Sequence, residues 1–200
     1  SAARILGGFF TALTLGTVLG WVASRFWVVE TLLRPITAVI KATPVASFII
    51  LVLLWFSGKN LSVIISMLMV FPVIYMNVLE GIRSADKKLL EMAQVFRLSV
   101  GKKLLYIYLP AVAPFFVSAC SVSLGLCWKS GIAAEVIGTP DGSIGAVFYQ
   151  AKIFLQTSEL LAWTVVVVAV SVAFEKLFMF LLRLILKKLK MEDVLNGKRA

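Results

Sequence analysis

The sequence predicts an all-α integral membrane protein with five visible membrane-spanning helices. Of its 200 residues, 60% are hydrophobic and 15% are charged, whereas a soluble domain is about 45–50% apolar. The mean hydropathy is +0.99, and the uncharged runs are spread along the whole chain without a polar domain beside them. A soluble fold of this size could not bury that much apolar surface, so we predict one membrane domain over residues 1–200.

The first predicted span covers residues 5–24, which carry no charge. At about 1.5 Å per residue, a helix of this length matches a hydrocarbon core of about 30 Å. Gly16 and Gly20 lie one helical turn apart within it, a spacing that lets a neighbouring helix approach closely. Because the chain enters this apolar run almost directly after Ser1, we expect a further helix upstream.

The later spans are separated by turn signals and charges. The second covers residues 42–58, with a start as early as 36, and a tight turn at 57–60 precedes the third span at 61–79, which contains Pro72. The fourth covers 111–132, a Gly/Pro-rich loop follows at 138–145, and the fifth covers 160–182. Glu175 and Lys176 interrupt this last span, and we expect them to make interfacial or inter-helix contacts.

Charge distribution predicts the orientation. The net charge of +10 does not indicate nucleic-acid binding, because the basic residues lie between apolar runs and not along a polar face. Residues 83–103 contain Arg83, Lys87, Lys88, Arg97, Lys102 and Lys103, and the segment after 182 contains Arg183, Lys187, Lys188, Lys190, Lys198 and Arg199. Residues 133–159 contain only Lys152 among the lysines and arginines. By the positive-inside rule, the first two segments are cytoplasmic, the third is external and Ser1 is outside.

Residue usage argues against an enzyme. The chain has no histidine, and Cys120 and Cys127 both lie inside an apolar run, where helix packing is their expected role. No catalytic triad, metal-ligand spacing or phosphate-binding Gly-x-x-x-x-Gly-Lys-Ser/Thr loop occurs, so we expect no chemical catalysis, no metal and no bound cofactor in this chain.

The most informative segment lies in the basic loop, over about residues 83–110. Glu91 and Ala93, with Leu109-Pro110 at matching distance, resemble the EAA loop of ABC importer permeases. This resemblance implies a MetI-like permease fold and contact of the loop with a separate ATPase subunit. Two departures are Met92 at the first alanine position and Arg97 at the usual glycine position, with Gly101 arriving later. The turn between two short helices is therefore expected to be built differently.

The same loop has a physical pattern of its own. Met92, Val95 and Phe96 lie at helical spacing and predict a short amphipathic helix, whose apolar face could enter a groove on a partner. An alternative is a helix that lies on the membrane surface, attracted by its lysines.

A second resemblance comes from residues 126–138, which contain Trp128 and the run Ala133-Ala134-Glu135, and from Arg4 to Phe9 near the start. Both are similar to permeases of the nitrate/sulfonate/taurine type. The resemblance implies an ATPase subunit that binds ATP and Mg, an extracytoplasmic solute-binding protein, and a second permease chain, most simply in a homodimer, all at a bacterial inner membrane.

Lys129 and Glu135 are candidate translocation-pathway residues. Ionisable groups cost about 2.5–3.5 kcal/mol at the centre of a bilayer on insertion scales, so each needs water, a partner or the interface. Lys129 could line the path and favour an anionic solute. Alternatively, it snorkels or pairs with Glu135.

Together these patterns predict the membrane-spanning permease of an ATP-driven, binding-protein-dependent importer of a small solute, such as nitrate, a sulfonate or taurine. The alternatives are a secondary transporter or channel that is not coupled to an ATPase, for which buried acidic relays would be a sign, and a membrane scaffold without transport activity.

Overall fold

The computed structural model describes residues 1–188, and within that range the chain is helical, without a strand. The elements are α1 (Ala2–Arg25), α2 (Trp27–Ala42), α3 (Val45–Leu53), α4 (Gly58–Arg83), α5 (Lys87–Val95), α6 (Val100–Lys103), the π-helical turn η1 (Leu104–Tyr108), α7 (Leu109–Gly138), α8 (Ile144–Ile153) and α9 (Thr157–Lys188). The all-α prediction is confirmed. The part of the predicted basic tail from Lys190 to Arg199 lies outside the described residues.

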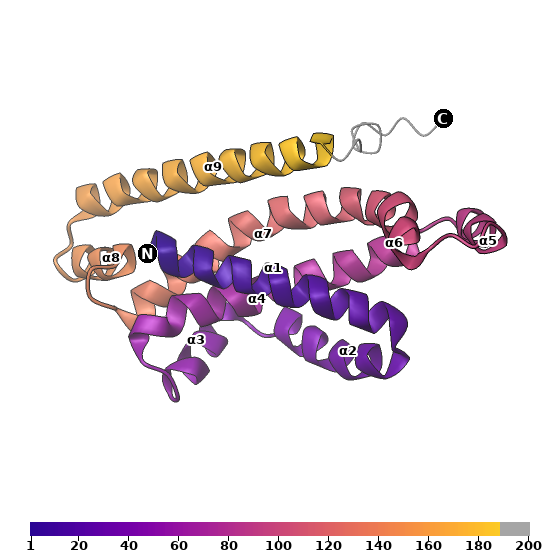
Figure 1. The fold of residues 1–200 in the computed structure, drawn as a ribbon. Coiled ribbons are helices and arrows are strands. Elements are labelled where there is room, and N and C mark those ends of the chain that lie inside the picture. The colour runs from indigo at the N-terminus through magenta and orange to yellow at the C-terminus, as the bar shows by residue number, and fades with distance from the viewer. Residues whose placement is uncertain (189–200) are drawn as a thin grey trace.

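Helices α1, α4 and α7 form the core of the molecule (Figure 1). A Cβ added to Gly16 would lie 2.9 Å from Cβ of Ile74, and one added to Gly20 would lie 2.9 Å from Cγ1 of Val78. The contacts advance in the same direction along both helices, so α1 and α4 run parallel. The close packing predicted for Gly16 and Gly20 is confirmed, since any side chain there would force the two backbones apart.

Because α1 and α4 run parallel, the chain must return between them, and α2 with α3 makes that return. The two helices are bent by 105° at Thr43 and Pro44. Thr43 is extended, with φ −82° and ψ 133°, as expected for a residue whose helical conformation clashes with the ring of a following proline. The prediction of one continuous helix over residues 42–58 was therefore wrong. The tight turn at 57–60 was also wrong, because Ser57 directly precedes α4 and the helix begins at Gly58.

Helix α7 runs antiparallel to α4 over its whole length. Gly81 packs against Val112 near one end, and Gly58 packs against Gly138 at the other. Between them, the Ser66 hydroxyl donates to the carbonyl of Cys127 at 3.2 Å. The residues fully buried among these three helices include Phe9, Val70, Ile74 and Leu124.

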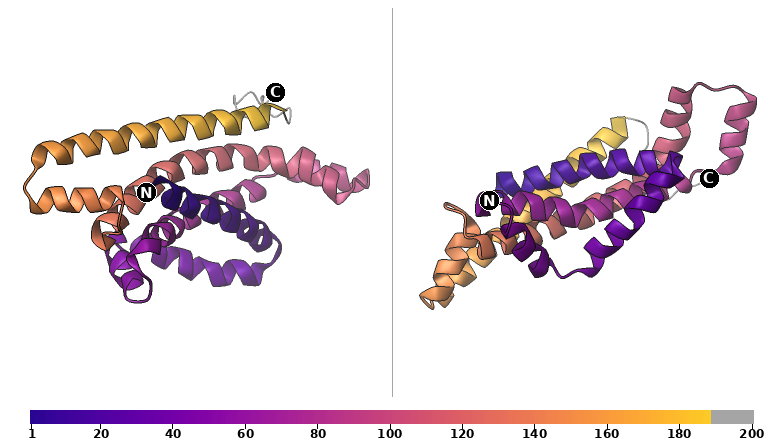
Figure 2. Two further views of the ribbon diagram at one scale, coloured as in Figure 1. Left: turned by 60° about the vertical axis from the view of Figure 1, so that its left-hand side comes forward. Right: turned by 90° about the horizontal axis from the view of Figure 1, so that it is seen from below.

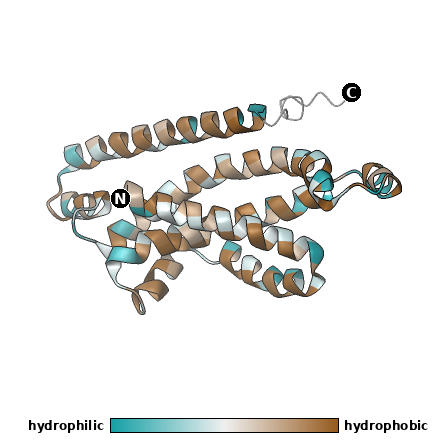
Figure 3. Cartoon of the chain, in the orientation of Figure 1, coloured by the Kyte–Doolittle hydropathy of each residue, from teal (hydrophilic) through white to brown (hydrophobic). Residues whose placement is uncertain are grey.

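Helix α9 packs on one side of this core and runs antiparallel to α7, with Leu186 against Ala113. Phe178 meets Phe9 edge to face, with ring centroids 5.3 Å apart. No residue in the most hydrophobic part of α9 is buried, and Figure 3 shows that it is apolar along most of its length with hydrophilic residues at both ends. Such a helix is typical of a surface that faces lipid or another membrane protein.

Four helical segments are long and apolar enough to cross a membrane, and the bent pair α2 and α3 raises the total to five if it counts as one span. The predicted number of spans is therefore consistent with the structure. Helices α5 and α6 extend beyond one end of the core, and α8 lies at the opposite end (Figure 2). The two candidate functional regions lie at these opposite ends.

Candidate functional site

The loop between α4 and α7 contains the predicted EAA-like segment. Helix α5 begins after Asp86, whose carboxylate accepts a hydrogen bond from the backbone N–H of Lys88 at 2.9 Å and so caps the helix. On its inner side, Ala93 is fully buried in a small cluster with Ala85 and Ile107. A larger residue at Ala93 would push α5 away from η1, which explains why this position needs a small side chain.

The outer side of this loop is apolar and uncovered. Val95, Phe96 and Val100 are 78%, 71% and 84% exposed, and Met92 is also exposed. Met92, Val95 and Phe96 lie at helical spacing on or directly after α5, and we call these three residues the loop face. An exposed apolar surface that stands clear of the membrane-spanning helices is typical of a site that binds another protein.

The turn after α5 contains Arg97, which stands where the EAA loop usually has a glycine. Arg97 has φ +48°, the left-handed conformation that glycine adopts without cost and other residues adopt at about 1–2 kcal/mol. Its N–H donates to the carbonyl of Gln94 at 3.0 Å, and the N–H of Leu98 donates to that of Ala93 at 2.9 Å. This is the Schellman motif that ends many helices. Arg97 thus adopts a conformation that glycine adopts readily, and the expectation of a differently built turn stays a prediction.

Two other residues of the loop have simpler surroundings. Glu91 is exposed and makes no hydrogen bond or ion pair with any other described residue, so its carboxylate is open to a partner. Gly101 is exposed and has nothing within 4 Å of an added Cβ. The structure gives Gly101 no steric role, and the left-handed position belongs to Arg97.

At the opposite end of the molecule, Lys129 and Glu135 lie in different environments. Lys129 is exposed on α7, whereas Glu135 is 0% exposed. The contacts of Glu135 within the described chain do not include Lys129, so the alternative in which the two residues pair does not hold in this structure. A pathway role for either residue stays a prediction.

Glu135 instead joins four helices. Its carboxylate accepts from the hydroxyl of Ser62 on α4 at 3.4 Å and from the N–H of Gly145 on α8 at 3.5 Å. Arg4 of α1 lies 3.7 Å away from it. The Ser1 hydroxyl also donates to it and accepts from the N–H of Ile144 at 2.8 Å. These contacts supply a fully buried carboxylate with the hydrogen-bond donors that a buried polar group needs. We call this group the Glu135 cluster.

Sequence reasoning missed the partners in this cluster. Arg4 and Ser62 are far from Glu135 in sequence, and their types carry no spacing signal. The close packing of Gly145 was indicated in the sequence by one feature, the Gly/Pro-rich loop that contains it. A Cβ on Gly145 would lie 2.3 Å from Cβ of Glu135, so only glycine allows α8 to pack so closely on α7.

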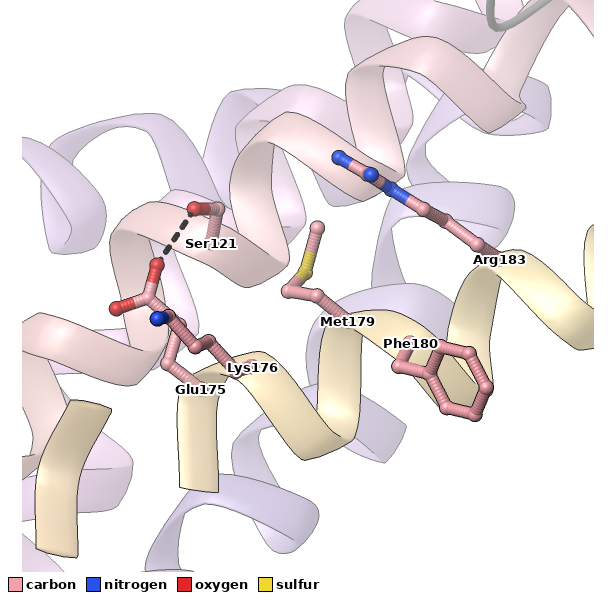
Figure 4. Close-up of a pocket in the computed structure, with 6 residues that line it drawn as sticks. All are labelled: Ser121, Glu175, Lys176, Met179, Phe180 and Arg183. Atoms are coloured by element: carbon pink, nitrogen blue, oxygen red, sulfur yellow. Dashed lines mark hydrogen bonds between the residues drawn. The ribbon is translucent and has the colours of Figure 1, made fainter. Parts of the chain in front are cut away.

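A third polar feature lies between α7 and α9. Glu175 accepts a hydrogen bond from Ser121 at 3.0 Å, which confirms the predicted inter-helix contact. Both residues border a pocket of about 300 Å³ that is also lined by Lys176, Met179, Phe180 and Arg183 (Figure 4). Ser121 lies near the middle of α7 and Glu175 near the middle of α9, so this contact joins the two helices about halfway along their lengths.

Comparison with known proteins shows a family and several relatives that this chain resembles. The model of the family described as "Binding-protein-dependent transport system inner membrane component" matches residues 12–191. The chain is 29% identical over 182 residues to SsuC of Bacillus subtilis, a permease named for aliphatic sulfonates, covering 90% of this chain and 65% of that protein. It is 27% identical over 176 residues to the taurine transport system permease protein TauC of Escherichia coli, covering 88% and 64%.

A third relative is the nitrate import permease protein NrtB of Synechococcus elongatus, which is 25% identical over 185 residues that cover 82% of this chain and 66% of that protein. The chain thus spans just under two thirds of the length of these relatives. The matched region includes the loop face and the Glu135 cluster, apart from Ser1 and Arg4.

Proposed function

The chain belongs to the family of binding-protein-dependent transport system inner membrane components, and from that premise we propose that it is the permease subunit through which an ATP-driven importer moves a small anion. It is a multi-pass protein of the inner membrane. ATP and Mg are bound and hydrolysed in a separate ATPase subunit, and an extracytoplasmic binding protein delivers the solute.

The loop face is the observation that supports this proposal most strongly. Met92, Val95 and Phe96 are exposed apolar residues outside the candidate membrane spans, and the exposed Glu91 is next to Met92 in the sequence. This combination suits insertion into a groove on a cytoplasmic protein. If this helix lay on the lipid surface instead, the hydrogen-bonded turn at Arg97 would have no evident role.

The loop is connected directly to the helices that would have to move. Helix α4 ends at Arg83 and α7 begins at Leu109, and the two pack along their whole lengths. Ala93 fixes α5 against η1, the turn that leads into α7. A partner that displaces α5 would therefore shift α4 and α7 together, because packed helices move as bodies and do not deform continuously.

An open face of α7 is the proposed contact with a second permease chain and with the solute path. Ser118, Val122 and Lys129 lie on one side of the helix and are exposed, and Gly125, on the same side, has nothing within 4 Å of an added Cβ. Small and polar residues on one face of a membrane helix are typical of a helix interface or a water-filled path. Two copies of the chain facing each other here would enclose a path between them.

An anionic solute fits the charges on this face. Lys129 is not neutralised by Glu135, which is buried with Arg4. The relatives are named for sulfonates, taurine and nitrate, which supports the same class. By the positive-inside rule, we assign the basic end with α5 and α6, and the basic end of α9, to the cytoplasm.

Uptake into proteoliposomes tests this proposal. The full-length permease, its ATPase and binding protein are reconstituted, and labelled taurine, an alkanesulfonate, nitrate and a neutral amino acid are compared with and without internal ATP. We expect ATP-dependent uptake of an anion. Uptake that follows an ion gradient in the absence of ATP would establish the secondary-transporter alternative instead.

A matched pair of variants then tests the role of Lys129. Lys129→Gln removes the exposed charge on the open face of α7, and Lys59→Gln removes one at the start of α4. We expect anion uptake to fall about tenfold only in the first, since tenfold corresponds to about 1.4 kcal/mol. Equal uptake by both variants would remove Lys129 from the pathway.

A further inference from the structure

Arg97 is the one non-glycine residue of the α5–α6 loop in the left-handed region, with φ +48°. The hydrogen bonds that close the turn are made by backbone groups of Arg97 and Leu98. They need the left-handed conformation but not the arginine side chain. A glycine would make the same turn without strain.

The Arg97 side chain does not stabilise the loop in any other way. It is exposed and forms no hydrogen bond or ion pair within the described residues. The nearest acids in sequence are Asp86, which caps α5, and Glu91. A strained residue whose side chain contributes nothing to its own fold is typical of a functional position.

Its surroundings indicate what the side chain binds. Arg97 directly follows Phe96 of the loop face in the sequence, and both residues are exposed. Lys87, Lys88, Lys102 and Lys103 lie in the same loop, so the segment that contains that apolar face is positively charged. A partner groove that accepts this surface needs an apolar floor and an acidic rim.

We propose that Arg97 forms a charge-assisted, two-point hydrogen bond with a carboxylate on the ATPase subunit, at the edge of the groove that receives Phe96. The Arg97 side chain is exposed and makes no hydrogen bond or ion pair within the described residues, so both of its outer nitrogens are open to one carboxylate. Guanidinium is suited to this contact because its planar donors match the two oxygens. This proposal rests on the proposed function, because it assumes that the loop face binds an ATPase.

Binding of the ATPase to the full-length permease in nanodiscs of zwitterionic lipid is the test. Neutral lipid removes any contribution from attraction between the loop and an anionic membrane. The variants are Arg97→Gly, Arg97→Lys and Phe96→Ala, and the readouts are the Kd at two salt concentrations and the Tm of the permease alone. Arg97→Gly should leave the Tm equal to or above that of the wild type, because it removes the strain.

We expect Arg97→Gly to weaken binding about tenfold or more and to reduce its salt dependence, and Arg97→Lys to retain part of the affinity, since a charge-assisted hydrogen bond is among the stronger polar contacts. A second step pairs Arg97→Glu with reversal of each acid on the rim of the ATPase groove. Restored binding in one pair identifies the carboxylate.

The outcomes separate the two proposals. Wild-type affinity in Arg97→Gly together with weak binding by Phe96→Ala overturns the Arg97 contact but keeps the loop face as the ATPase site. Wild-type affinity in both variants, or a wild-type permease that binds no ATPase, contradicts the proposed function itself.

Discussion

The two ends of the core formed by α1, α4 and α7 differ in how completely their groups are satisfied. At the end with α8, Glu135 is fully buried and is surrounded by hydroxyl, amide and guanidinium donors. At the end with α5, Phe96 is 71% exposed and Arg97 is held in a left-handed conformation. At the first end Glu135 finds its donors within one chain, although one buried guanidinium nitrogen of Arg4 makes no hydrogen bond, whereas the second end presents apolar groups that the described chain leaves uncovered.

Under the proposed function, this difference suits two tasks. The end with the Glu135 cluster holds the helices in register, while the end with α5 follows a partner. A buried charge with several donors is costly to disturb, so the Glu135 cluster resists movement of α1, α4, α7 and α8 relative to one another. The loop face costs little to rearrange because few of its side chains are packed.

The largest effect is expected from Glu135→Ala. It removes the common acceptor of Ser62, Arg4 and Gly145 and leaves their donors buried, which should destabilise the chain by about 3 kcal/mol. Thermal unfolding in detergent measures this as a fall in Tm. Glu135→Gln is the control, and it should lose less because it retains an acceptor. A Tm unchanged in Glu135→Ala would show that the cluster does not hold this end together.

A smaller effect is expected from Gly8→Ala. The added Cβ would lie 2.4 Å from the carbonyl oxygen of Val63 on α4, and overpacking of this kind costs about 1–3 kcal/mol. The neighbouring Gly7→Ala is the matched control, because nothing lies within 4 Å of that position, and it should stabilise the helix by about 0.5–1 kcal/mol. If both variants shift Tm in the same direction, the close parallel packing of α1 on α4 is wrong.

Ser121→Ala tests the contact between the core and α9. It removes the hydrogen bond to Glu175 and should cost about 1 kcal/mol. Because few residues of α9 are buried, we expect faster hydrogen exchange in α9 of the variant than in α9 of the wild type, measured by mass spectrometry, with exchange in α4 unchanged. Equal exchange in wild type and variant would mean that this hydrogen bond does not restrain α9.

The smallest effect on stability is expected at the other end. Phe96→Ala removes an exposed side chain, so the free energy of unfolding should change by no more than about 0.5 kcal/mol and the Tm should hardly shift. The same variant should lose binding of the ATPase. A large fall in Tm would show that Phe96 packs within its own chain and would contradict the description of the loop face as uncovered.

Periodicity and charge were enough to predict four of the five spans, their order and the polar helical loop, because long uncharged runs have few alternatives in a membrane protein. They missed the 105° bend at Pro44, which depends on how α2 packs as well as on the proline. The Glu135 cluster could not be predicted either, since Arg4, Ser62 and Gly145 come together only through the parallel packing of α1 and α4. At Arg97, residue type did not indicate the left-handed conformation, because that backbone geometry is set by the hydrogen bonds of the turn.

ATP hydrolysis in proteoliposomes containing the full-length permease, its ATPase and its binding protein is the most direct test of the central claim, which is that the loop face transmits ATPase action to the membrane helices. Wild type is compared with Glu91→Ala, whose exposed carboxylate has no partner within the described chain. We predict that solute-loaded binding protein stimulates hydrolysis in the wild type and that the stimulation collapses in Glu91→Ala, with the Tm and the assembly of the complex unchanged. Equal stimulation in both proteins would contradict the account.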